Sequence, residues 1–121
     1  MKTIFAVDDS DTNLMTVEES LEDHYRVMTI PSAAKMFTFL EKIIPDLILL
    51  DIEMPEMNGF EALERLKSRP LYADIPVIFL TGYLDDSITA RSRELGAADI
   101  IVKPFSPPVL LNCIETQLSS K

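Results

Sequence analysis

The stretch at residues 46–51, DLILLD, decides the fold class of this 121-residue chain. It is an uninterrupted apolar run between two aspartates, whereas a strand with one face in water alternates apolar and polar residues. A continuous run is typical of a strand covered on both faces, as in parallel sheets flanked by helices. Similar runs occur at 3–7 (TIFAV), 25–30 (YRVMTI), 75–82 (IPVIFLTG) and 99–104 (DIIVKP). A five-stranded parallel sheet is therefore predicted.

Helical patterns separate these runs, as in residues 11–23, where Leu14, Val17 and Leu21 recur at helical spacing. The other predicted helices are one opened by Pro31 and Ser32, with Ala33, Met36, Leu40 and Ile43 on one face and Pro45 as its stop; one from Phe60 to near Pro70; one at 85–95 with Gly96 as its cap; and one beginning at Ser106 and Pro107. Strict alternation of five strands and five helices predicts an α/β domain over residues 1–121, doubly wound, with right-handed crossovers and helices on both faces.

Composition and charge narrow the function classes. The formal net charge of −9 argues against direct nucleic-acid binding, which needs clustered Lys and Arg, and permits a cation site. No apolar run approaches the roughly 18 residues of a membrane span, and MKTIFAVDDS is not a secretory signal, so no membrane contact is expected. The single cysteine, Cys113, cannot form an internal disulfide, which predicts a reducing compartment, the cytoplasm.

Polar side chains follow four of the five predicted strands. Asp8 and Asp9 come after the first, Asp51 after the third, Thr81 ends the fourth, and Lys103 follows the fifth. Sites in open α/β sheets lie outside the carboxyl ends of the strands, so these side chains are expected at one edge. Each alone has an ordinary explanation, such as a helix cap, a turn or a solvated strand end. Their joint occurrence at four strand ends favours a functional site.

Three close carboxylates repel one another unless a cation offsets their charge. If the first and third strands are neighbours, Asp8, Asp9 and Asp51 converge into an oxygen-rich site suited to Mg²⁺. Lys103 adds a point charge and Thr81 a hydroxyl donor. Phosphoryl transfer needs this combination, because its catalysis is mostly positioning and electrostatics, and an aspartate can itself be the nucleophile.

Four motifs resemble the receiver domain of bacterial response regulators, which has the flavodoxin-like chemotaxis-regulator fold. They are VDDS at 7–10, LILLDIEMPEMNG at 47–59, IFLTG at 78–82 and VKPF at 102–105, and the resemblance spans essentially the whole chain. It implies strand order 2-1-3-4-5. It also implies a switch in a two-component system, which takes a phosphoryl group from a sensor histidine kinase or phosphotransfer protein and then controls a downstream protein or an output domain.

The resemblance implies a role for each matching acidic residue. Asp51 would be the phosphoacceptor, and Asp8 and Asp9 would serve Mg²⁺ or Mn²⁺ together with Asp51 and the backbone carbonyl of Glu53. Glu53 and Tyr83, two residues after the acceptor and two after the switch threonine, would flank the site mouth. Beyond self-phosphorylation and autodephosphorylation, no conventional enzyme activity is expected.

The resemblance also implies the switch residues. Thr81 would be the switch hydroxyl and Lys103 the phosphoryl-binding lysine, with a cis bond to Pro104. The second switch position, often aromatic in the family, is Ile100, so a ring flip is not expected there.

Three alternative functions match parts of the sequence. Residues 9–13 imitate the start of an EF-hand loop, but Leu14 and Ser20 stand where that loop needs Gly and Glu. A haloacid dehalogenase-type phosphatase also places an aspartate after its first strand, but Asn13 and the acid-poor sequence after Lys103 fit it poorly. A receiver-like interaction domain that is never phosphorylated usually lacks the acceptor, the acid pair or the lysine, all of which are present here.

The output surface is predicted around the fourth helix, the last strand and the final helix. The helix at 85–95 has the weakest apolar stripe, with Ile88 and Leu95 and few partners between them. Leu110 and Cys113 are expected on a side of the final helix that joins this face. The face would receive a partner or a second copy of the chain as a homodimer, the alternative being that these residues simply widen the core stripe.

Overall fold

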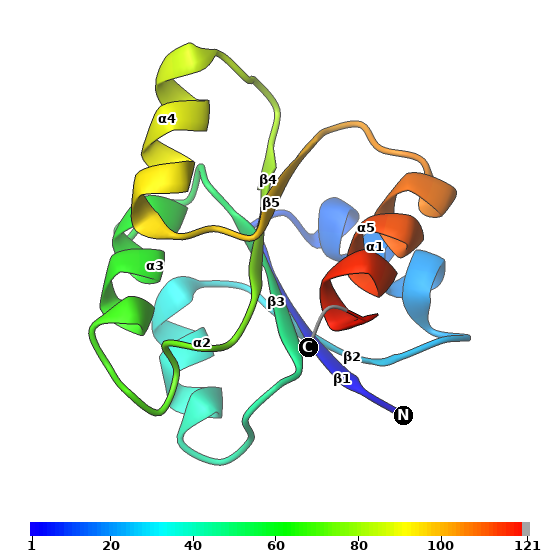
Figure 1. Cartoon of the computed structure of the whole chain (residues 1–121). Coiled ribbons are helices and arrows are strands. Elements are labelled where there is room, and N and C mark those ends of the chain that lie inside the picture. Colours follow the sequence, from blue (N-terminus) through cyan, green and yellow to red (C-terminus); the bar gives the residue numbers. More distant parts are fainter. Residues whose placement is uncertain (120–121) are drawn as a thin grey trace.

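The computed structural model describes residues 1–119 and contains one parallel sheet of five strands in the order β2-β1-β3-β4-β5 (Figure 1). The strands are β1 (Thr3–Val7), β2 (Arg26–Ile30), β3 (Leu47–Asp51), β4 (Val77–Thr81) and β5 (Asp99–Val102). This confirms the predicted fold and strand order. Because β1 and β3 are neighbours and strand order reverses around them, their carboxyl ends form the switch point where sites are expected.

The helices alternate with the strands and cover both faces of the sheet. They are α1 (Asp11–Leu21), α2 (Ala33–Leu40), α3 (Gly59–Lys67), α4 (Asp86–Leu95) and α5 (Pro107–Ser119). In Figure 1, α1 and α5 lie on one face, whereas α2, α3 and α4 lie on the other. Within residues 1–119, no helix combines the length and the apolar character that a membrane crossing requires.

The apolar run in β3 is buried on both faces, as its sequence predicted. Ile48 and Leu50 pack into the core under α2 and α3, whereas Leu47 and Leu49 pack into the core under α1 and α5. Successive side chains of a strand point to opposite faces, so one run supplies both cores. This double burial holds the carboxyl end of β3 rigidly in the middle of the sheet.

Three helices are shorter than predicted. Helix α1 ends at Leu21, α3 ends at Lys67, and α2 ends at Leu40 rather than near Pro45. After α2 the amides of Lys42 and Ile43 both donate to the carbonyl of Phe39, so the chain tightens into a turn. Ile43 still packs against the core, which explains why its spacing imitated another helical turn.

The ends of α4 and α5 follow their predicted caps. Gly96 ends α4 with a left-handed φ of 86°, a conformation that glycine adopts without strain. The amide of Val109 donates to the Ser106 hydroxyl at 3.4 Å, and α5 begins at Pro107.

The predicted position of Leu110 on an output surface is wrong. Leu110 is fully buried and packs with Ile114 in the core under α1 and α5. Adjacent apolar residues on a helix point in different directions, and the sequence does not say which of Leu110 and Leu111 faces the sheet. The structure assigns that place to Leu110, while Leu111 is half-buried.

Candidate functional site

The carboxyl ends of β1 and β3 bring three aspartates together. Val7 pairs with Leu50 across these strands, so Asp8 and Asp51 extend from neighbouring positions. Asp8 is 2% exposed and Asp51 3% exposed, whereas Asp9 is exposed. One carboxylate oxygen from each of the three lies within 4.8 Å of the others. The convergence expected from the strand order is therefore present.

Lys103 provides the charge that offsets the buried carboxylates. Its Nζ lies 3.2 Å from Asp8 Oδ2 and 3.2 Å from Asp51 Oδ1. Its backbone amide donates to the Thr81 carbonyl at 2.7 Å, which fixes the lysine beside the end of β4. The bond to Pro104 is cis, as predicted. Asp8 and Asp51 can both lie at this edge because the charged Lys103 side chain, which follows the edge strand β5, reaches between them.

Burial and charge act in opposite directions on the ionisation of Asp51. The pKa of Asp51 is raised to about 6 in total: burial contributes most of the rise, the nearby Asp8 charge adds to it, and Lys103 offsets it in part. For Lys103, burial lowers the pKa, but the charges and hydrogen bonds of Asp51 and Asp8 outweigh it, and the net pKa is raised. At neutral pH the site therefore holds an ionised Asp51 with a high-energy, poorly solvated carboxylate beside a charged lysine.

Backbone contacts hold both buried acids in place. The Ser10 amide donates to Asp8 Oδ1 at 3.0 Å, and the Asp8 amide donates to the Ile30 carbonyl at 3.1 Å. Behind Asp51, Gly59 at the start of α3 packs so closely that an added Cβ would lie 2.6 Å from the Asp51 carbonyl oxygen. Gly59 ends the motif at 47–59, but its contact with Asp51 could not be predicted, because a close backbone approach from another element leaves no local pattern.

The hydroxyl of Thr81 points along the loop after β4. Thr81 is fully buried, its Oγ1 donates to the Tyr83 carbonyl at 2.7 Å, and the Tyr83 amide donates back at 3.3 Å. In this structure its single donated hydrogen bond is therefore made to Tyr83 rather than to a group at the acidic site.

A small cavity of about 200 Å³ opens above the aspartates. It is lined by Asp8, Asp9, Ser10, Asn13, Asp51, Glu53, Gly82 and Lys103. Ser10, Asn13 and Gly82 were not predicted. Ser10 and Asn13 form a helix cap, in which the Ser10 hydroxyl accepts from the Asn13 amide at the start of α1. A capping pattern was therefore the sequence signal that could have identified these two residues. Tyr83 is not among the lining residues, so its place at the site mouth stays a prediction, as does the role of the Glu53 carbonyl.

The donor set suits a hard divalent cation. Three carboxylates supply oxygen ligands, and the cavity leaves room for the waters that Mg²⁺ keeps. The side chains of Asp8 and Asp51 are already in ion pairs with Lys103. A cation placed among the three aspartates would meet the same two acids that Lys103 holds.

Comparison with known proteins agrees with this geometry. A sequence model described as response regulator receiver domain matches residues 4–115. The chain belongs to the response regulator receiver family. This receiver shares 40% identity over 119 residues with a Vibrio cholerae protein named "probable cyclic di-GMP phosphodiesterase", a match that covers 98% of the chain and 27% of that protein. The receiver thus spans about a quarter of that relative's length.

Solved structures with the same fold include two informative neighbours of this receiver. Chemotaxis protein CheY4 of Vibrio cholerae is 30% identical with a TM-score of 0.91, covering 96% of this chain and 98% of that one. The BeF3-activated receiver domain of DrrB, from Thermotoga maritima, is 30% identical with a TM-score of 0.87, covering 100% and 99%. The receiver fold and family do not favour the phosphatase or the never-phosphorylated alternative.

Proposed function

We propose that Asp51 is the phosphoacceptor of this receiver. The observation that carries the proposal is the position of its carboxylate, which is buried at the end of β3, 3.2 Å from Lys103 and within 4.8 Å of oxygens of Asp8 and Asp9. With a pKa of about 6, Asp51 is ionised at neutral pH and able to attack. Because the Asp51 carboxylate is poorly solvated, phosphorylation is favoured: it moves the negative charge from the buried carboxylate to the phosphoryl oxygens, which lie further from the core.

The transfer requires little covalent machinery. An Oδ of Asp51 attacks the phosphorus of a phosphohistidine, the O–P bond forms, and the N–P bond breaks with its electron pair leaving on the imidazole nitrogen. Lys103, a point charge between the two buried acids, contacts the phosphoryl oxygens once they arrive. Asp8 and Asp9, with Asp51 and the Glu53 carbonyl, would hold Mg²⁺ or Mn²⁺. A bound divalent cation supplies positive charge that offsets the charge on the transferring group.

Labelling with a small phosphodonor tests this proposal. Incubation with phosphoramidate and Mg²⁺ should make the protein about 80 Da heavier, which is the mass of one added HPO₃ unit. The new bond should be stable in acid, labile in base and located on Asp51. Asp51→Asn should remove the label and keep the fold. Asp46→Asn is the matched control, because Asp46 lies at the opposite end of β3 and accepts from the Thr3 amide at 2.7 Å. Label retained at wild-type level in Asp51→Asn would show that the acceptor is another residue.

Metal dependence gives a separate test. Millimolar Mg²⁺ should raise the melting temperature of wild-type protein, because a ligand that binds only the folded state stabilises it. Asp9→Asn should reduce that rise, since it removes one of three anionic ligands. Asp11→Asn, an exposed acid two residues away on α1 that is outside the cluster, is the control. An equal rise in wild type and Asp9→Asn would contradict the proposed ligand set.

The receiver family implies a phosphoryl donor and an output. A sensor histidine kinase or phosphotransfer protein is the proposed donor, and the cytoplasm is the proposed compartment of the transfer. The receiver then acts as a switch on a separate protein or an attached output domain. The 40% identical relative is named as a phosphodiesterase over a much longer chain. Self-phosphorylation and slow autodephosphorylation are the only reactions proposed for the receiver. No direct contact with nucleic acid is proposed.

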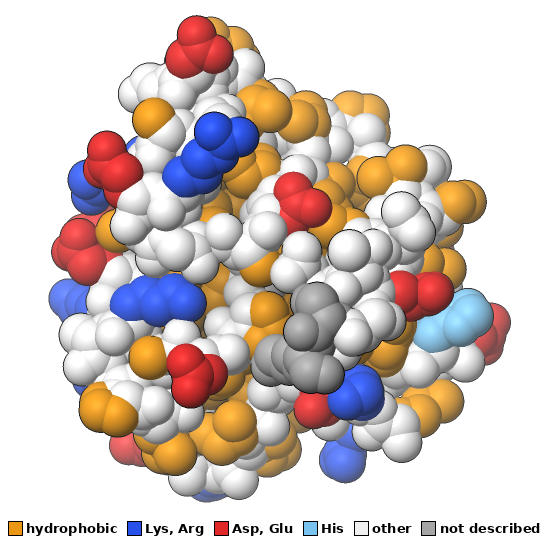
Figure 2. Space-filling view, viewed as in Figure 1, with side chains coloured by type: hydrophobic (Ala, Val, Ile, Leu, Met, Phe, Trp, Pro, Cys, Tyr) orange, Lys and Arg blue, Asp and Glu red, His pale blue; other side chains and the backbone are white. Residues whose placement is uncertain are grey.

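The output face is proposed on α4, β5 and α5, where a partner or a second copy would bind as a homodimer. Exposed large apolar side chains from this region are Tyr83, Leu84, Val102 and Val109, and Figure 2 shows hydrophobic surface between the α4 and α5 sides. Beryllofluoride with Mg²⁺ should change amide exchange in residues 82–105 more than in 14–45. A larger change in 14–45 would place the output on another face.

A further inference from the structure

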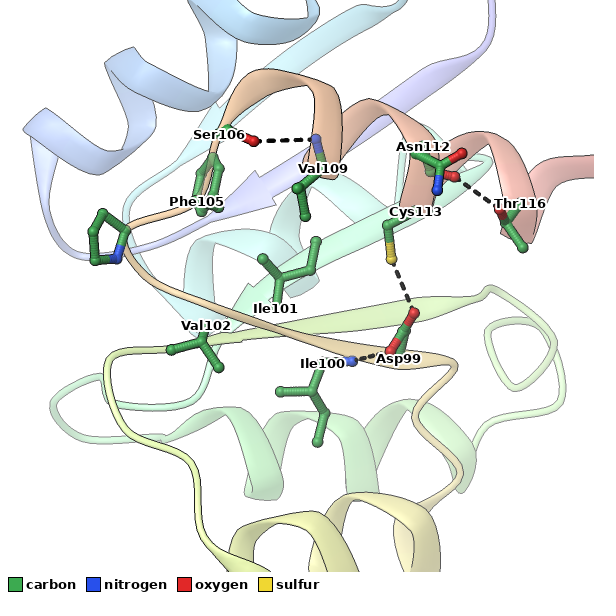
Figure 3. Close-up of a pocket in the computed structure, with 11 residues that line it drawn as sticks. Asp99, Ile100, Ile101, Val102, Phe105, Ser106, Val109, Asn112, Cys113 and Thr116 are labelled. Carbon is green, nitrogen blue, oxygen red and sulfur yellow. Dashed lines mark hydrogen bonds between the residues drawn. The ribbon is translucent and has the colours of Figure 1, made fainter.

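Ile100 faces a hollow between β5 and α4. In Figure 3 its side chain points toward the α4 side of the sheet, whereas that of Ile101 points toward α5. The hollow measures about 340 Å³ and includes Leu84, Thr89, Ser92, Ala97 and Ile100 in its lining. Arg93, Ala98 and Asp99 complete its lining, so both apolar and polar residues border the hollow.

Tyr83 is an exposed aromatic residue directly before Leu84, which lines this hollow. The residue is 62% exposed, and its chain neighbour Leu84 lines the hollow while remaining 43% exposed. Large aromatic side chains gain free energy when their rings are buried, provided the hydroxyl stays hydrogen-bonded or wet. The β4–α4 loop therefore holds an exposed aromatic side chain one residue before a hollow whose lining combines apolar residues with the polar side chains of Thr89 and Ser92.

The hydroxyl of Thr81 fixes the backbone that carries this ring. It donates to the Tyr83 carbonyl at 2.7 Å and accepts from the Tyr83 amide at 3.3 Å. A threonine hydroxyl has one proton to donate. If it donates to a phosphoryl group on Asp51, it must release the Tyr83 carbonyl, and the turn over residues 81–83 loses its closing bond.

Helix α4 offers little resistance to a change in this loop. Ser92 is its only buried residue, and Ile88 and Leu95 are half-buried. An element with few buried apolar contacts opens at low free-energy cost. A ring can therefore enter between β5 and α4 without breaking a packed core.

We propose that Tyr83 is the aromatic reporter of this receiver, whose ring moves from solvent into the hollow beside Ile100 when Thr81 turns to the phosphoryl group. The inference rests on the proposed phosphorylation of Asp51. Position 100 then supplies the empty space rather than the moving ring, and the β4–α4 loop supplies the ring. The filled hollow changes the surface formed by α4 and β5.

Fluorine NMR on protein containing 3-fluorotyrosine tests this inference. The chain has three tyrosines, so Tyr25 and Tyr72 act as internal references, and Tyr83→Phe assigns the third signal. Adding beryllofluoride and Mg²⁺ should reduce the solvent isotope shift of the Tyr83 signal by at least about half, because a buried ring loses contact with water. The Tyr25 and Tyr72 signals should stay unchanged. Bound beryllofluoride gives fluorine signals of its own, which report occupancy of the site.

Two variants test the coupling and the destination. Thr81→Val keeps the side-chain shape without the hydroxyl and should give a Tyr83 signal that no longer responds to beryllofluoride. Ile100→Phe fills the hollow and should keep Tyr83 exposed, whereas Val109→Phe, which adds a ring beside the separate α5 hollow, should preserve the response. Bound beryllofluoride with an unmoved Tyr83 would overturn this inference alone. Absence of any bound beryllofluoride in wild type would overturn the proposed function and this inference with it.

Discussion

Helices α3 and α4 lie side by side on one face of the sheet (Figure 1) but are attached to it very differently. Helix α3 buries Gly59, Ala62, Leu63 and Leu66, and a capping box closes its first turn. Helix α4 buries only Ser92, whose hydroxyl donates back to the Ile88 carbonyl of its own helix. A buried leucine contributes about 1.5–3 kcal/mol relative to an exposed one, and a buried serine contributes no such term.

This difference divides the region around the site into a rigid part and a movable part. Gly59 of α3 packs against the backbone of Asp51, and its amide donates to the Ile52 carbonyl at 2.8 Å. Helix α4 follows the loop whose backbone hydrogen-bonds to Thr81. Asp51, the proposed acceptor, is thus held by the strongly packed helix, and a conformational response is expected in the weakly packed one.

Core truncation should break the comparison most strongly. Leu63→Ala on α3 should lower the free energy of unfolding by about 2–5 kcal/mol, as for other fully buried leucines. Ile88→Ala on α4 should lower it by about 1 kcal/mol, because its side chain is only partly buried. Urea unfolding followed by circular dichroism measures both. Equal losses would show that α4 is as firmly packed as α3.

Removing the charge on Asp51, which packs against α3, should raise the free energy of unfolding. The pKa of Asp51 is about 6 in the fold against an ordinary value of 3.8. Between these values folded Asp51 binds its proton more tightly than unfolded Asp51, so the contribution of Asp51 to the stability of metal-free wild type falls as pH rises from about 4 to 6. Asp51→Asn lacks this loss and should be more stable by about 1–3 kcal/mol at pH 7.

The matching control for that measurement is pH itself. At pH 4, where Asp51 is protonated in the fold, Asp51→Asn should gain little over wild type in urea unfolding with a chelator present. A gain of the same size at both pH values would mean that Asp51 does not store this electrostatic cost. If Asp51→Asn only slowed hydrogen exchange of the α4 amides, the destabilising effect of the Asp51 charge would act on α4 instead.

Cap removal should give the smallest effects and should separate global from local stability. Asn58→Ala removes the cap of α3 and Asp85→Ala that of α4, each a side chain that accepts from a first-turn amide. The cost of either is about 1 kcal/mol to its helix. Asn58→Ala should lower global stability, whereas Asp85→Ala should mainly speed hydrogen exchange in α4. Faster exchange in both helices with the same global loss would contradict an independent α4.

The order of elements was predictable because it depends on local periodicity. The double-sided burial of 47–51 and the helical spacing of Leu14, Val17 and Leu21 are properties of short segments, and the structure contains both. Helix ends were less predictable. Ile43 has helical spacing, yet α2 ends at Leu40 and the chain turns there, because a turn can bury the same side chain that another helical turn would bury.

The amino-acid sequence by itself determined the alternation of strands and helices, and with it the polar and charged residues that reach one edge of the sheet. Only the tertiary structure decided which of them touch: that Lys103 bridges Asp8 and Asp51, and that the Thr81 hydroxyl binds Tyr83. It also decided that Leu110, not Leu111, enters the core. Periodicity reports how one segment meets water, whereas these contacts join segments far apart in the chain or depend on rotamers within a turn, and packing alone selects them.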